Sequence, residues 1–151
     1  MALQNKSESP DEIREQAAHA AHNAYAPYSQ FYVGAAVLLA SGHIVTGCNV
    51  ENASYRLTTC AEQTAIARAV AEHGPDIRIV AVAVAHADPI IACQPCGACR
   101  QTIAEFADGA CPIYYPGRNG EPGACTLADL LPAVFTPQSL RDAAAHAGDK
   151  I

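Results

Sequence analysis

One segment restricts the possible folds of this chain more than any other. Residues 77–85 form an almost continuous apolar run that is rich in β-branched side chains. A strand with one face in water alternates apolar and polar residues, whereas a strand that is apolar throughout is covered on both faces. The run therefore predicts a central strand with a layer of helices on each side of its sheet.

The segments around this run alternate between helical and extended patterns. The sequence Ser9-Pro10-Asp11-Glu12 is typical of a helix start, and a small-residue helix is expected to follow it. Further helices are expected over residues 60–73, 96–107 and 127–131, and strands over 31–39, 43–49, 77–85 and 111–115. Residues 116–123 are expected to form a loop rich in Gly and Pro, and residues 1–8 and about 141–151 to be flexible.

This order of elements predicts a three-layer α/β/α sandwich around a mixed, five-stranded type of sheet. At 151 residues, the chain is expected to form one domain over residues 1–151.

Composition and charge narrow the classes of function. Half of the residues are apolar and only 16% are charged, which favours an oligomer that buries apolar surface between subunits over a monomer with an Ala-rich core. The net charge is −6 and no cluster of Lys or Arg is present, which argues against nucleic acid and for a small-molecule substrate. Neither a membrane span nor a leader segment is predicted, so a cytoplasmic location is expected, where the seven cysteines stay reduced.

Three cysteines and a glutamate form the pattern that points to chemistry. Cys60-Ala61-Glu62 and Pro95-Cys96-Gly97-Ala98-Cys99 each place thiols at the start of an expected helix, where the helix dipole stabilises a thiolate. Three thiolates bind Zn²⁺ and leave its fourth position for water, whose pKa then falls to roughly 7. Glu62 lies beside the metal without being needed as a ligand, so we expect it to shuttle protons, as in the zinc deaminases.

Two other interpretations of these cysteines stay open at this point. A structural zinc site would need a fourth ligand, for which His86, Cys93 and Cys111 are the candidates, and it would leave Glu62 without a purpose. A redox pair at Cys96 and Cys99 would leave both Cys60 and Glu62 unexplained.

Five stretches of the chain, taken together and in this order, closely resemble the short, tetrameric cytidine deaminases. They are Pro27-Tyr28-Ser29-Gln30-Phe31-Tyr32-Val33-Gly34-Ala35-Ala36, Gly47-Cys48-Asn49-Val50-Glu51-Asn52-Ala53-Ser54-Tyr55, Cys60-Ala61-Glu62, Pro95-Cys96-Gly97-Ala98-Cys99-Arg100-Gln101 and Leu130-Leu131-Pro132-Ala133-Val134-Phe135. The resemblance implies hydrolytic deamination of cytidine and 2′-deoxycytidine in pyrimidine salvage, by attack of zinc-bound hydroxide at C4. It also implies one zinc per subunit and a homotetramer whose sites are shared between subunits.

The same resemblance assigns roles to residues outside the zinc centre. Asn49 and Glu51 match the pair that holds the ribose 3′-hydroxyl, and Phe31 matches the aromatic ring that packs on the pyrimidine. The backbone N–H of Ala61 is expected to hold the base carbonyl. Phe135 resembles an aromatic residue that enters a neighbouring subunit's site, and Tyr55 resembles an interface tyrosine near such a site.

One departure from the family affects the charge of the zinc centre. Many relatives carry Arg directly after the catalytic Glu, where this chain has Gln63. We expect Arg100 and the helix dipoles to offset the charge of three thiolates; the alternatives are that Arg56 moves in or that turnover is slower. The departure also leaves room for a modified or N4-substituted cytidine, or for a cytosine antibiotic such as blasticidin S. The alternative outside enzymes is a zinc-stabilised binding module.

Overall fold

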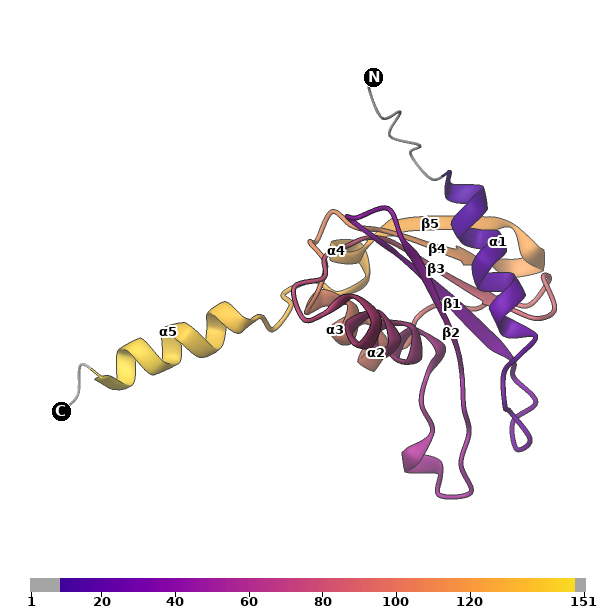
Figure 1. The fold of residues 1–151 in the computed structure, drawn as a ribbon, viewed down its shortest axis with the longest axis horizontal. Helices are drawn as coiled ribbons and strands as arrows, with labels where there is room; N and C mark the ends of the chain where they lie inside the picture. Colours follow the sequence, from indigo (N-terminus) through magenta and orange to yellow (C-terminus); the bar gives the residue numbers. More distant parts are fainter. Residues whose placement is uncertain (1–8, 149–151) are drawn as a thin grey trace.

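A mixed five-stranded sheet with the strand order β2-β1-β3-β4-β5 forms the centre of the protein (Figure 1). The structure is a computed structural model that describes residues 9–148. Its strands are β1 (Val33–Leu39), β2 (Ile44–Cys48), β3 (Ile79–His86), β4 (Pro112–Pro116) and β5 (Pro122–Thr126). Strands β3 and β4 run parallel and the other neighbours run antiparallel, so the mixed five-stranded sheet is confirmed.

Helices cover both faces of this sheet. Helix α1 (Pro10–Ala21) lies on one face, and α2 (Ala61–His73) and α3 (Gly97–Ala104) lie on the other (Figure 1). Alternate residues of β1 point to opposite faces of the sheet: Val37 packs in the same cluster as α2, whereas Ala36 packs with α1. The expected three-layer α/β/α arrangement is confirmed. The structure also contains three short helices: η1 (Tyr55–Leu57), η2 (Arg118–Gly120) and α4 (Leu127–Leu130).

Two glycines allow the helices to approach the sheet closely. A Cβ atom on Gly34 of β1 would lie 2.1 Å from the carbonyl oxygen of Ala17 in α1. A Cβ atom on Gly47 of β2 would lie 2.4 Å from the backbone nitrogen of Ala65 in α2. Real Cβ atoms essentially never come within 3.0 Å of such atoms, so any side chain at these positions would force the helix away from the sheet.

The sequence-based expectations were wrong at two places. Residues 116–123 do not form only a loop, because β5 begins at Pro122 and pairs with β4 from Pro112↔Thr126 to Pro116↔Pro122. Residues 137–148 form a helix that the sequence analysis did not expect, α5 (Pro137–Gly148), which extends away from the sheet in Figure 1. Residues 1–8 and 149–151 lie outside the described residues. No helix in the described part of the chain has the length and apolarity to cross a membrane.

Candidate active site

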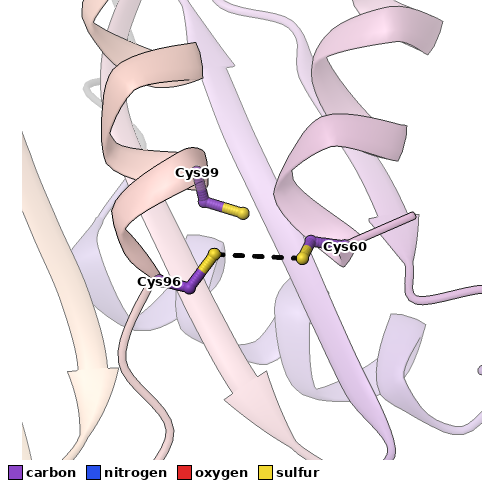
Figure 2. Close-up of side chains that lie close together, drawn as sticks. All are labelled: Cys60, Cys96 and Cys99. Atoms are coloured by element: carbon purple, nitrogen blue, oxygen red, sulfur yellow. Dashed lines mark hydrogen bonds between the residues drawn. The ribbon is translucent and has the colours of Figure 1, made fainter. Parts of the chain in front are cut away.

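Three cysteine side chains from two helices converge at one point (Figure 2). Cys60 is the N-cap residue of α2, Cys96 is the N-cap residue of α3, and Cys99 lies one turn further along α3. Their sulfur atoms all lie within 4.8 Å of one another, and the Cys60 and Cys96 sulfurs are 4.0 Å apart. The structure thus brings together the three thiols that the sequence analysis selected.

This group fits a zinc ion in both spacing and chemistry. A Zn–S bond of about 2.3 Å in tetrahedral geometry separates two sulfurs by about 3.8 Å, close to the observed spacing of Cys60 and Cys96. Both of these residues have extended backbone angles and open a helix, so free N–H groups at two helix ends surround the thiols. The partial positive charge there favours thiolates, which are the form that binds metal.

The pKa values of Cys60, Cys99 and Glu62 depart from their ordinary values in different directions. The hydrogen bond from the Cys99 thiol lowers the pKa of Cys60 to about 7, whereas this bond and burial raise the pKa of Cys99. Burial raises the pKa of Glu62, whose side chain is only 3% exposed on the first turn of α2.

The candidates for a fourth metal ligand lie outside this group. In the part of the chain that the structure describes, Cys60, Cys96 and Cys99 are the one set of three or more potential ligands within such a distance. His86 packs against Phe31 instead, and the Cys111 thiol donates to the carbonyl of Pro112 at 3.7 Å. Cys93 is buried in the wall of the adjoining cavity, and burial raises the pKa of its thiol to about 12.

A cavity of about 340 Å³ opens beside the cysteines, a size typical of small-molecule sites. Besides Cys93, it is lined by seven residues that the sequence analysis expected in the active site. These are Phe31, Asn49, Glu51, Cys60, Ala61, Glu62 and Cys96. The carboxyl of Glu62, two thiols of the three-cysteine group, an aromatic ring and two polar side chains therefore line one cavity.

Asn49 and Glu51 lie on the same side of the chain, just after β2, and both organise the segment opposite them. The Asn49 Oδ1 accepts a hydrogen bond from the N–H of Val33 at 2.9 Å, and its Nδ2 donates to the carbonyl of Phe31 at 2.9 Å. One hydrogen on Nδ2 and one lone pair on Oδ1 are left for other partners. Glu51 accepts from the N–H of Tyr28 at 2.8 Å and from the N–H of Ser29 at 3.2 Å.

Sequence reasoning missed Ser29, Thr58 and Gln94, which also line the cavity. The Ser29 hydroxyl donates to Glu51, and this bond is the main reason that the pKa of Glu51 lies below its ordinary value. Ser29 and Glu51 are 22 residues apart, and no sequence pattern links the two positions. Only the fold brings them together.

Tyr55 and Phe135 lie outside the cavity and are strongly exposed. Tyr55 on η1 is 75% exposed and lines a neighbouring hollow together with Tyr28 and Glu51. Phe135 is 59% exposed, and its carbonyl accepts a hydrogen bond from Gln101 of α3 at 2.9 Å. Helix α3, which carries Cys99 and begins after Cys96, is thereby bonded to the segment that carries Phe135.

Arg100 and Gln63 are the two residues expected to tune the charge of the centre. The Nε of Arg100 donates to the carbonyl of Pro95 at 2.8 Å, directly before Cys96, and another guanidinium nitrogen donates to the carbonyl of Leu130 at 2.9 Å. Gln63 is half-buried and follows Glu62 on α2. The guanidinium of Arg100, a residue of α3, is thus held against the segment directly before the ligand Cys96.

Comparisons with known proteins agree with this arrangement. Residues 7–115 match the family model described as the cytidine and deoxycytidylate deaminase zinc-binding region. The cytidine deaminase of Sporosarcina psychrophila is 44% identical over 125 residues, which are 83% of this chain and 90% of that protein. The cytidine deaminase of Halalkalibacterium halodurans is 41% identical over 128 residues, 85% of this chain and 95% of that protein.

Solved structures show the same fold. The crystal structure of cytidine deaminase from Burkholderia pseudomallei has a TM-score of 0.76 at 39% identity and covers 84% of this chain and 99% of its own. That of the Mycobacterium tuberculosis cytidine deaminase has a TM-score of 0.73 at 42% identity, with coverage of 83% and 95%. The sequence match, the fold and the donor set for zinc agree, and the chain therefore belongs to the family of zinc-binding cytidine and deoxycytidylate deaminases.

Proposed function

We propose that the protein hydrolyses the 4-amino group of cytidine and 2′-deoxycytidine, producing uridine or 2′-deoxyuridine and ammonia. The observation that carries this proposal is the shared cavity, into which a buried carboxyl and thiols of the three-cysteine group open together. Water supplies the oxygen of the product carbonyl and the amino group leaves with its nitrogen, so the reaction needs no redox partner.

Cys60, Cys96 and Cys99 would hold the metal. When bound, zinc acts as a Lewis acid that lowers the pKa of a water molecule to a value near neutral pH. Glu62 takes up one proton from the attacking water and delivers it to the ring nitrogen N3. It then takes the remaining proton from the new hydroxyl at C4 and passes it to the amino group, which leaves as ammonia. Burial raises the pKa of this carboxyl, which supports the role because a proton shuttle works best when its pKa lies near the working pH.

The remaining cavity residues would orient the nucleoside. The ring of Phe31 packs against the pyrimidine, and the N–H of Ala61, in the first turn of α2, holds the base carbonyl. Asn49 and Glu51 receive the ribose 3′-hydroxyl. Glu51 is suited to accept this hydrogen bond because its lowered pKa keeps the carboxylate charged, and Asn49 retains one free donor and one free acceptor.

A second subunit would complete the site in a homotetramer. Support comes from Tyr55 and Phe135, two large aromatic side chains that are exposed in the single chain. Tyr55 lines a hollow next to the cavity, and the segment of Phe135 is bonded to α3. A cytoplasmic location is part of the proposal, and all seven cysteines are free thiols, as expected in a reducing compartment.

The test is the loss of ultraviolet absorbance when the purified zinc protein is mixed with cytidine, compared between wild type, Glu62→Gln and Glu72→Gln. Glu72 makes the matched control because it is an exposed glutamate on the same helix. Glu62→Gln should lose nearly all turnover and retain its zinc, and Glu72→Gln should keep wild-type turnover.

N4-substituted cytidines and blasticidin S are measured in parallel. Turnover of one of these compounds without turnover of cytidine would refute the proposed substrate and leave the zinc chemistry in place. Zinc binding without turnover of any of them would refute the enzyme and favour a zinc-stabilised binding module.

A further inference from the structure

His86 is a buried side chain that the proposed reaction leaves without a role. It is the last residue of β3 and is 9% exposed. Its side chain lies on the same face of the sheet as Val82 and Val84, the face that α2 and the three cysteines occupy. The imidazole packs on the ring of Phe31, with 4.6 Å between ring centroids and 52° between the ring planes.

The imidazole is fixed by backbone groups at both of its nitrogen atoms. The N–H of Tyr32 donates to Nε2 at 3.3 Å, and the N–H of Asp88 lies 2.9 Å from Nδ1. Nδ1 also lies 3.3 Å from the carbonyl oxygen of Asp88, so in the tautomer with its proton on Nδ1 the ring donates to this carbonyl and accepts from Tyr32 at Nε2, and both nitrogens have a backbone partner. His86 therefore contacts the ring of Phe31 and holds the residue that follows it.

The backbone of Phe31 is secured from the other side as well. Asn49 accepts from the N–H of Val33 and donates to the carbonyl of Phe31, each at 2.9 Å. Gln30, just before it, has φ = 57°, in the left-handed region that few residues other than glycine adopt. The backbone is thus held by Asn49, while the 40% exposed ring of Phe31 has His86 on one side and the cavity beside it.

We infer that His86 is a positioning residue: it supports the ring of Phe31 so that this ring forms a fixed wall for the pyrimidine base. The inference rests on the proposed function. His86 lies on β3, whereas Cys60 and Glu62 lie on α2 and the other two thiols on α3, so its loss leaves the reacting groups in place. Loss of the contact between an aromatic pair corresponds to a KM increase of up to about tenfold.

The experiment compares cytidine kinetics of the zinc-loaded wild type, His86→Leu and His86→Phe, with His43→Leu as the control at an exposed histidine. His86→Leu should raise KM about five- to tenfold and leave kcat within about twofold, the pattern of lost ground-state binding. His86→Phe restores a ring and should return KM to within about twofold of wild type. If His86→Leu fails to fold, His86→Gln replaces it, because its amide retains an acceptor for Tyr32 and lacks the ring.

A second readout does not depend on turnover. The chain has three phenylalanines, so fluorophenylalanine labelling gives three ¹⁹F signals, assigned by substituting each in turn. The Phe31 signal should shift in His86→Leu, whereas the signals of Phe106 and Phe135 stay in place. An unchanged Phe31 signal, an unchanged KM or a loss of kcat alone would overturn the inference. Absence of turnover in wild type would instead refute the proposed function, and the ¹⁹F comparison would still test the contact.

Discussion

The close approach of α2 to the sheet leads to a quantitative prediction for Gly47→Ala. The new Cβ would lie 2.4 Å from the nitrogen of Ala65 and 2.7 Å from the oxygen of Ala61. To reach an ordinary contact of 3.4 Å, α2 has to move by about 1 Å, and overpacking of this kind costs about 1–3 kcal/mol. For a protein of this length, a loss of about 3 kcal/mol lowers Tm by about 6–12 °C.

This movement should also weaken zinc binding, because α2 carries Cys60 at its N-cap and Cys96 and Cys99 lie on another helix. Gly34→Ala is the matched control: its Cβ would lie 2.1 Å from the oxygen of Ala17 and would displace α1, which carries no ligand. Both variants should lose stability, and only Gly47→Ala should also lose zinc affinity, by about tenfold or more.

The assay combines thermal unfolding with zinc competition against a chromophoric chelator. If Gly47→Ala lost stability but held zinc as tightly as Gly34→Ala, the reasoning that α2 is positioned through its contact with Gly47 would be refuted.

Two further predictions concern charge in and around the cavity. If Arg100 and the helix dipoles offset the charge of the thiolates, Gln63→Arg should change kcat less than about tenfold, or about 1.4 kcal/mol of barrier; a larger gain in steady-state kcat would show that they do not suffice. Ser29→Ala removes the hydroxyl that chiefly lowers the pKa of Glu51, so this pKa should rise toward its ordinary value. Glu51 would then become protonated at a higher pH as the pH falls; an unchanged midpoint in a ¹³C NMR titration would contradict the assignment.

The zinc centre could be predicted from sequence because its determinants are local. Cys60 and Cys96 each directly precede a helical pattern, and Cys99 follows Cys96 by one turn, so the thiols had to lie at helix starts. The central position of β3 followed in the same way from its apolar run. In each case the segment itself carries the pattern that determines its structure.

The missed features depend on partners elsewhere in the chain. Strand β5 has the sequence Pro-Gly-Ala-Cys-Thr, which has little intrinsic strand preference, and pairing with β4 supplies its hydrogen bonds. The bond from Ser29 to Glu51 and the packing of His86 on Phe31 join residues distant in sequence. Helix α5 was missed for another reason, since its polar residues resemble those of a frayed tail and every side chain from Pro137 to His146 is exposed.

The central claim is that one zinc ion per subunit, held by Cys60, Cys96 and Cys99, enables hydrolysis of cytidine. The most direct measurement adds zinc stepwise to the metal-free protein and records the initial rate of uridine formation against bound zinc. We predict a rate that rises in proportion to bound zinc and reaches its plateau at one zinc per subunit. Zinc bound to this level without uridine formation, or a rate that does not depend on zinc, would contradict the account.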